Sequence, residues 1–245
     1  MLPGEKSARK FARRLRGRVP SAFAAIDVAL PRRRPPWGGP LNGQLGRQSL
    51  VRSLMRLRTP AIIVETGTYL RVTTEFLAAL TGATVWTCES QPIYFRAAQK
   101  RFRDNHLVHA VLADSPDFLR SLASDLSIPK DNAFFYLDAH WDANLPLREE
   151  IEIIGESWRK PWILIDDFEV PGDHGYGYDD YGSGVALIFD YLELAPLWTA
   201  LVPALPSEQE TGARRGCVLL AHPEDAHSLL ETGLLSLPVR GDVGL

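Results

Sequence analysis

Short apolar runs alternate with helical patterns through most of this chain, from residue 61 to residue 195. The apolar runs are rich in β-branched and aromatic residues, which favours strands that are buried on both faces. Strands are predicted at 61–65, 84–89, 107–114, 132–140 and 161–168. Helices are predicted between and after them at 73–82, 92–105, 116–126, 146–158 and 185–195. This alternation predicts a doubly wound α/β fold, in which helices cover both faces of a parallel sheet.

The last two apolar runs depart from this alternation. Residues 198–205 and 215–222 read as strands, and the connection between them, PSEQETGAR, is too short and too polar for a crossover helix. Two strands joined in this way should pair antiparallel. The sequence therefore predicts a Rossmann-like, mostly parallel sheet of seven strands that ends in an antiparallel hairpin. A further helix is predicted before the first strand, at 44–57.

Charge is distributed unevenly along the chain. Residues 1–58 carry a net charge of +12 and the other residues a net charge of −15. We interpret residues 1–43, which are rich in Arg and Pro, as a basic N-terminal arm, and residues 44–245 as a single domain. Such an arm suits nucleic acid or an anionic membrane surface. A solvated arm that offsets the acidic domain, and an organelle transit peptide, are alternative interpretations.

The two cysteines, Cys88 and Cys217, each lie inside an apolar run. This placement predicts buried thiols in strands and a reducing, cytoplasmic compartment. No run approaches the roughly 18–20 apolar residues of a membrane-spanning helix, so no transmembrane segment is expected.

Acidic residues stand where each of the first five strands ends. In open α/β sheets, ligands bind outside the carboxyl ends of the strands. The first strand ends in Glu65-Thr66-Gly67-Thr68-Tyr69, where glycine permits a tight turn. The later strands end in Glu89, in Asp114-Ser115, in Asp138-Ala139-His140 and in Asp166-Asp167. Because so many acids at one edge need a cation or a polar ligand, the pattern favours a nucleoside-like ligand, with or without a divalent metal.

These residues support a family resemblance over about residues 45–222. The segment VETGTYLRVTTEFLA, the acids after strands two and three, YLDAHW and the final hairpin resemble the class I S-adenosylmethionine-dependent methyltransferases, and in particular the catechol, caffeoyl-coenzyme A and macrocin-type O-methyltransferases. The resemblance implies S-adenosylmethionine as cofactor. It implies that the first loop holds the methionine part, Glu89 the ribose, and Asp114 with Ser115 the adenine. The expected cofactor-binding residues are Glu65, Gly67, Thr68, Tyr69, Thr73, Glu89, Asp114, Ser115 and Asp138. Arg71 stands where the motif usually has a second glycine.

The resemblance also implies a metal site and a proton acceptor. Asp138, Asp166 and Asp167 correspond to metal-binding acids, and carboxylate oxygens suit Mg²⁺, Ca²⁺ or Mn²⁺. Asp138 and His140 are the candidate catalytic residues, with His140 as a general base whose unperturbed pKa is about 6.5. A metal-free version stays open, in which Asp138 and His140 handle the proton and Asp166 and Asp167 cap the loop after the fifth strand.

The loop 171–184, PGDHGYGYDDYGSG, is the candidate acceptor site. Its glycines allow closure, and its tyrosines offer flat amphipathic surface. The expected acceptor contacts are Asp173, His174, Tyr176, Tyr178, Asp179 and Tyr181.

The sequence as a whole predicts an S-adenosylmethionine-dependent methyltransferase that modifies a hydroxyl of a small molecule, either a sugar or a phenol. The alternatives are an RNA methyltransferase that uses the basic arm, and a hydroxylase-like or non-catalytic protein on the same fold. A nicotinamide dehydrogenase fits poorly because G-x-G-x-x-G spacing is missing, and a serine hydrolase fits poorly because there is no G-x-S-x-G turn.

Overall fold

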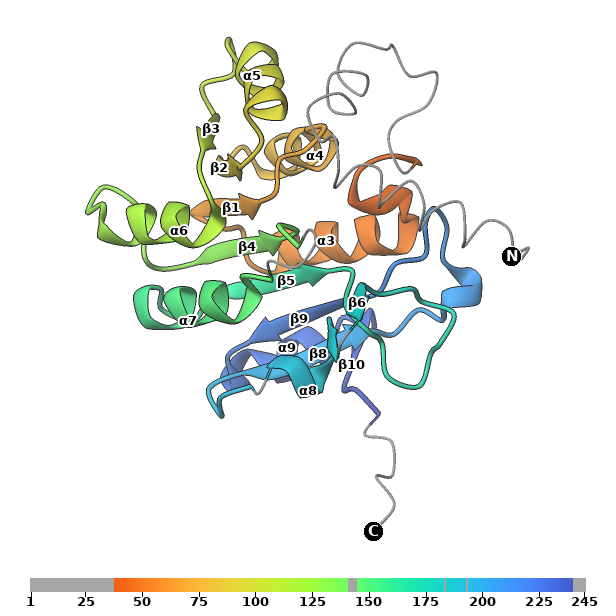
Figure 1. Cartoon of the computed structure of the whole chain (residues 1–245). Coiled ribbons are helices and arrows are strands. Elements are labelled where there is room, and N and C mark those ends of the chain that lie inside the picture. Colours follow the sequence, from red (N-terminus) through yellow and green to blue (C-terminus); the bar gives the residue numbers. More distant parts are fainter. Residues whose placement is uncertain (1–37, 141–144, 183, 193, 240–245) are drawn as a thin grey trace.

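The computed structural model describes residues 38–140, 145–182, 184–192 and 194–239. Its centre is one eight-stranded sheet in the order β10-β8-β9-β5-β4-β1-β2-β3 (Figure 1). The strands are β1 (Ile62–Thr66), β2 (Thr84–Glu89), β3 (Val108–Leu112), β4 (Ala133–Leu137), β5 (Trp162–Asp166), β8 (Thr199–Pro203), β9 (Cys217–Ala221) and β10 (Leu235–Ser236). From β3 to β5 all neighbours pair parallel, whereas β9 pairs antiparallel with both β5 and β8. The predicted fold class and the final hairpin are confirmed, and the short β10 adds an eighth strand at the edge.

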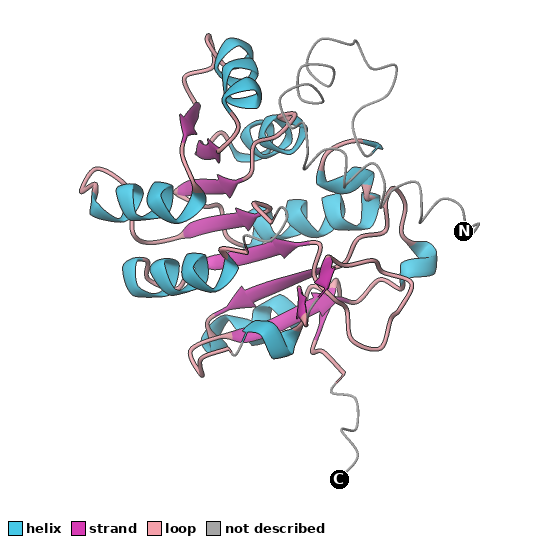
Figure 2. Ribbon diagram, in the orientation of Figure 1, coloured by secondary structure: helices cyan, strands magenta, loops and turns pink. Residues whose placement is uncertain are grey.

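Helices cover both faces of the sheet, as the apolar strands require (Figure 2). One face packs against α6 (Ser115–Ser124), α7 (Leu147–Ser157) and α8 (Phe189–Leu192). The other packs against α3 (Leu45–Leu57), α4 (Val72–Thr81), α5 (Pro92–Arg101) and α9 (Ala226–Leu230). Alternate residues of each central strand serve the two faces, with Val64 in one core cluster and Ile63 in the other. Cys88 and Cys217 are free thiols buried in β2 and β9, as predicted.

The helix predicted over 185–195 is mostly wrong. Val185–Ala186 form strand β7, which pairs antiparallel with β6 (Asp180–Gly182), and only Phe189–Leu192 is helical. Leu187 is fully buried, its N–H donates to the Asp179 carbonyl (2.9 Å), and its carbonyl accepts from the Glu169 N–H (2.8 Å). Tertiary hydrogen bonds therefore override the helical spacing of the apolar residues in this segment.

The N-terminus of α3 is capped by a distant connection. Glu210 accepts hydrogen bonds from the backbone N–H of Gly46 (2.9 Å) and Arg47 (3.0 Å), and the Thr211 hydroxyl accepts from Leu45 (2.8 Å). These contacts satisfy three of the four N–H groups that a helix start leaves unpaired. They fix α3 beside the connection between β8 and β9, which includes the 3₁₀ turn η3 (Ser207–Gln209).

The last residues of the expected basic arm pack against the domain. A 3₁₀ turn, η2 (Leu41–Gly43), precedes α3, and the Leu41 side chain is fully buried. Residues 1–37 of that arm lie outside the described residues, so its boundary and its partners stay predictions. A third 3₁₀ turn, η4 (Pro223–Asp225), precedes α9. No helix in the described part of the chain has the length and apolar character needed to cross a membrane.

Candidate functional site

The expected site residues gather at the edge formed by the carboxyl ends of the parallel strands. Glu65 lies one residue before the end of β1, and Glu89 and Asp166 end β2 and β5. Asp138 follows β4 directly, and its N–H donates to the carbonyl of Thr66 at 3.0 Å. The parallel register aligns these strand ends, so residues far apart in the sequence become neighbours.

The loop after β1 is built around Gly67. This residue has φ +94°, and a Cβ placed on it would lie 2.5 Å from the backbone oxygen of Asp138. The N–H groups of Gly67 and Thr68 donate to the carbonyl of Cys88 at 3.1 and 3.0 Å. The loop therefore passes so close to the start of the β4–α7 connection that only glycine fits.

Arg71 keeps the turn that a second glycine would make. It has φ +70° and forms the N-cap of α4, and Tyr69 in the same loop has φ +41°. A left-handed conformation at a non-glycine residue costs about 1–2 kcal/mol. The Tyr69 ring meets the Tyr94 ring edge-on, with 4.8 Å between ring centroids. The substitution at position 71 thus leaves the glycine-like backbone of the loop in place.

Glu65 and nearby threonines hold this loop in place through hydrogen bonds. The Glu65 carboxylate is 1% exposed and accepts hydrogen bonds from the hydroxyls of Thr74 (2.5 Å) and Thr87 (2.7 Å). Burial raises the pKa of Glu65 to about 7. The Thr68 hydroxyl lies 2.6 Å from that of Thr87, and the Thr73 hydroxyl accepts from the Leu41 N–H at 3.1 Å. These contacts fix the loop.

Glu89 is the acid expected at the cofactor ribose. It is 7% exposed and accepts hydrogen bonds from the N–H groups of Tyr69 (2.9 Å) and Gln91 (2.8 Å). Burial raises its pKa. The Ser90 N–H is a third backbone donor to this carboxylate. A carboxylate has about four lone-pair positions, so Glu89 keeps one with which to accept a hydrogen bond from a ligand hydroxyl.

Asp114 and Ser115 lie at the start of α6, where the adenine is expected. Asp114 is the exposed N-cap of α6, and Ser115 is its buried first residue. Beside them lies Glu150 of α7, which sequence reasoning missed. Its carboxyl is fully buried, and neither oxygen has a hydrogen-bond partner of good geometry among the described residues. Burial raises the pKa of Glu150 to about 7, although the nearby hydroxyls of Ser115 and Thr66 favour the ionised form.

Glu150→Gln should make the protein's stability less dependent on pH. The wild-type carboxyl ionises near pH 4.5 when unfolded and near pH 7 when folded. Folding therefore takes up a proton in this window, and the free energy of unfolding falls as pH rises through it, by about 3 kcal/mol for such a group. Urea unfolding from pH 4.5 to pH 8 measures this slope. The exposed Glu152→Gln is the control, and equal slopes in all three proteins would contradict the prediction.

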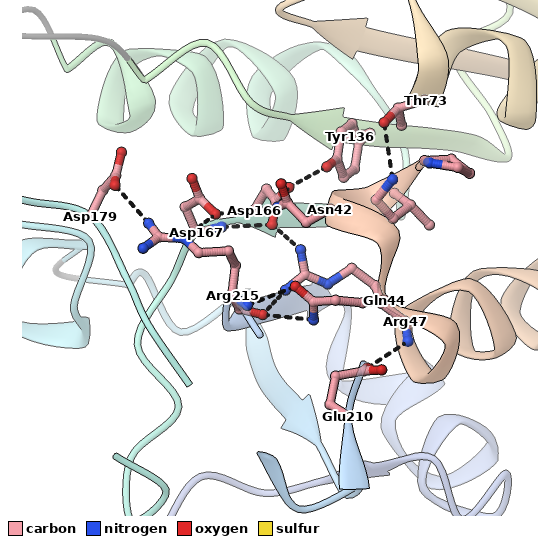
Figure 3. A network of polar contacts seen from close by, with 12 residues as sticks. Asn42, Gln44, Arg47, Thr73, Tyr136, Asp166, Asp167, Asp179, Glu210 and Arg215 are labelled. Atoms are coloured by element: carbon pink, nitrogen blue, oxygen red, sulfur yellow. Dashed lines mark hydrogen bonds and ion pairs between the residues drawn. The ribbon is translucent and has the colours of Figure 1, made fainter. Parts of the chain in front are cut away.

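A network of acids and arginines lies between β5, β9 and α3 (Figure 3). Arg47 of α3 forms a buried ion pair with Asp166, and the Asn42 amide and the Tyr136 hydroxyl also donate to Asp166. Arg215, just before β9, donates from Nε to Asp167 at 2.7 Å and from Nη2 to Asp179 at 2.6 Å. Sequence reasoning placed Asp166, Asp167 and Asp179 in the site but missed these partners.

One of the three acids expected to hold a metal, Asp166, is already occupied by hydrogen-bond donors in this arrangement. Asp166 Oδ1 accepts from Arg47 and from the Asp167 N–H, and Oδ2 accepts from Tyr136 and Asn42. A carboxylate has about four lone-pair positions, so donors already use all of those on Asp166. Across the described residues, no three His, Cys, Asp or Glu side chains are arranged to hold a metal ion together.

Asp138 and His140 have very different proton affinities. Burial and the neighbouring Asp166 and Asp167 raise the pKa of Asp138 well above its ordinary value. Burial lowers the pKa of His140 to about 4, below the value near 6.5 on which its expected role as a base rested. His140 is 4% exposed, and neither ring nitrogen has a hydrogen-bond partner of good geometry among the described residues, although the nearby backbone of Leu137 favours the charged ring. Of the two, Asp138 is the stronger proton acceptor.

The residues expected to contact an acceptor differ in how far their side chains are exposed. Tyr176 is 3% exposed and donates to the Leu205 carbonyl at 2.8 Å, and Asp173 accepts from Ser207, so the fold accounts for the contacts of both. Tyr178 and His174 are exposed. The Tyr181 hydroxyl lies within hydrogen-bond distance of the His140 carbonyl (2.9 Å) and of the Asp179 carboxylate (3.0 Å), which ties the loop to the strand edge.

Known proteins resemble this chain in structure more than in sequence. No protein-family model and no curated protein sequence matches it. An O-methyltransferase from Bacillus cereus in complex with S-adenosylhomocysteine (SAH) is similar, with TM-score 0.54, 16% identity, and coverage of 73% of this chain and 81% of that one. An SAH-bound methyltransferase from Podospora anserina is also similar, with TM-score 0.52, 17% identity, and coverage of 72% and 77%. The chain therefore has the fold of the class I S-adenosylmethionine-dependent methyltransferases.

Proposed function

We propose that this protein is an S-adenosylmethionine-dependent methyltransferase that modifies a hydroxyl of a small, uncharged molecule. The observation that carries the proposal is the edge of the sheet where the Gly67 loop, Glu89 and the start of α6 come together. These residues fit the cofactor, since a close backbone turn, a buried acid with a spare acceptor position and a helix start meet at one edge.

The charges of the site support an uncharged acceptor. Burial and the carboxylates of Asp166 and Asp167 raise the pKa of Asp138, so the field at this edge is negative although Arg47 and Arg215 pair with Asp166, Asp167 and Asp179. A negative field favours a cationic cofactor and disfavours an acceptor that carries phosphate or carboxylate groups. A sugar or a phenol carries neither a phosphate nor a carboxylate group, and the exposed Tyr178 offers a flat surface for either.

The chain's own residues would position the acceptor and take up its proton. S-adenosylmethionine, when bound, supplies a methyl group on a positively charged sulfur, which an oxygen nucleophile can attack in line. Asp138 follows β4 beside the Gly67 loop and is the candidate acceptor for the hydroxyl proton, because burial and its acidic neighbours raise its pKa and so make its ionised form a stronger base than an ordinary carboxylate. Positioning of the two reactants is the other main contribution of the chain.

SAH should stabilise the full chain against heat. At 100 times its dissociation constant a ligand adds about 2.7 kcal/mol, which for a chain of this size raises Tm by about 5–11 °C. Glu89→Gln should weaken SAH binding by about 10–100-fold, because it removes the charge from a hydrogen-bond acceptor. Thermal shift and calorimetric titration measure both effects.

The exposed Glu152→Gln serves as the control for Glu89→Gln and should bind SAH as the wild type does. A wild-type chain whose Tm does not respond to SAH would overturn the proposed function. Once SAH binding is shown, a screen of sugars and phenols with labelled S-adenosylmethionine identifies the acceptor.

A further inference from the structure

Both the backbone and the side chain of Arg215 form hydrogen bonds with other elements at the strand edge (Figure 3). Its backbone N–H donates to the Gln44 side chain at 2.7 Å, and its carbonyl accepts from Gln44 at 2.9 Å and from Arg47. Its guanidinium bridges Asp167 after β5 and Asp179 in the loop 171–184. Because other elements hold both the backbone and the guanidinium of Arg215, its positive charge stays between Asp167 and Asp179.

The guanidinium of Arg215 bridges two carboxylates that lie near Asp138. Nε and Nη2 are within 2.7 Å of Asp167 Oδ1 and Asp179 Oδ1. A planar guanidinium can bridge carboxylates with directed hydrogen bonds and keeps its charge at all relevant pH values. A divalent ion between Asp167 and Asp179 would have to share their carboxylates with this guanidinium and would be repelled by its positive charge.

Arg47 has a complementary role on the buried side. Its side chain is 2% exposed and pairs with Asp166, which is 1% exposed. Arg215 is 24% exposed and pairs with acids that are 23% and 17% exposed. One arginine therefore neutralises the interior of the acidic edge, and the other neutralises its more accessible part.

We propose that Arg47 and Arg215 are the resident cations of this site, and that Arg215 stands in for a divalent metal ion between Asp167 and Asp179. The site then needs no metal to keep its carboxylates together. The proposal rests on the proposed function only for the use of the site, because the place of Arg215 between the two carboxylates does not depend on which reaction the site performs.

Manganese binding tests this proposal directly, with Mn²⁺ as the probe and electron paramagnetic resonance of the free ion as the readout. The full-length wild-type chain should leave the signal of free Mn²⁺ unchanged, and neither Mg²⁺ nor a chelator should shift its Tm. Arg215→Gln should increase the affinity for Mn²⁺ at least about tenfold, since it removes a cation from a cluster of carboxylates. Adding Asp167→Asn to that variant should remove the gain.

Arg159→Gln is the control, because Arg159 pairs with Asp131 at an exposed position and is 77% exposed. It should bind Mn²⁺ no better than the wild type. Circular dichroism establishes that each variant is folded before it is titrated. Stoichiometric Mn²⁺ binding by the wild type that Asp167→Asn abolishes would overturn the proposal. A folded Arg215→Gln that still leaves Mn²⁺ free would contradict the assignment of Arg215 as the ion's substitute.

The same samples separate this proposal from the proposed function. If the wild-type chain binds SAH and also binds Mn²⁺ through Asp167, the proposed function stands and the proposal about Arg47 and Arg215 is wrong. If the wild-type chain binds neither SAH nor Mn²⁺, the proposed function is wrong and the proposal about the two arginines stands.

Discussion

Arg47→Met should lower the free energy of unfolding by about 3–5 kcal/mol, because it leaves the buried Asp166 carboxylate without its cation. Methionine fills most of the volume of the arginine stem, so lost packing contributes little. The variant also removes the hydrogen bond that Arg47 donates to the Arg215 carbonyl. Urea unfolding measures the change, and Tm should fall by about 6–20 °C.

A second substitution distinguishes lost charge from lost packing. Arg47→Met combined with Asp166→Asn should be more stable than Arg47→Met alone, because the unpaired charge is gone. Arg159→Met is the matched control, and its exposed pair with Asp131 should contribute no more than about 1 kcal/mol. If Arg47→Met were as mild as Arg159→Met, the buried ion pair would not support the fold in the way argued above.

Gly67→Ala should destabilise the protein by about 2–4 kcal/mol and weaken SAH binding as well. The new Cβ would lie 2.5 Å from the Asp138 carbonyl oxygen, and φ +94° is unfavourable for alanine. Relief of the overlap has to move either the loop after β1 or the start of the β4–α7 connection. Both lie at the expected cofactor edge, so thermal unfolding with and without SAH measures both effects.

Gly82→Ala provides the matched control for Gly67→Ala. Gly82 has φ +68°, but a Cβ there meets nothing within 4 Å. Gly82→Ala should therefore lower the free energy of unfolding only by the conformational penalty of about 1–2 kcal/mol and leave the SAH affinity unchanged. Equal effects of the two substitutions would show that the contact with Asp138 carries no weight.

Two buried charged residues that sequence reasoning missed, Arg47 and Glu150, had a signal in the sequence. Arg47 precedes Leu50, Val51 and Leu54 by three, four and seven positions, which places it on the buried stripe of α3. Glu150 lies three positions after Leu147 and four before Ile154, which places it on the buried stripe of α7. A charged residue inside an apolar stripe indicates a buried partner or a shifted pKa. No such pattern marks Arg215, which lies in a connection.

The sequence by itself determined the alternation of strands and helices as far as β5, the antiparallel end of the sheet and the edge at which the acids gather. It could do so because local apolar periodicity and strand burial are properties of short segments. The partners of the acids were decided only by tertiary structure. The residues of the Arg47–Asp166 pair are 119 positions apart, and those of the Arg215–Asp167 pair are 48 apart. Ion pairing depends on distance in space, which no local pattern encodes, so whether those carboxylates meet a metal ion or a guanidinium depends on how α3 and the start of β9 pack against β5.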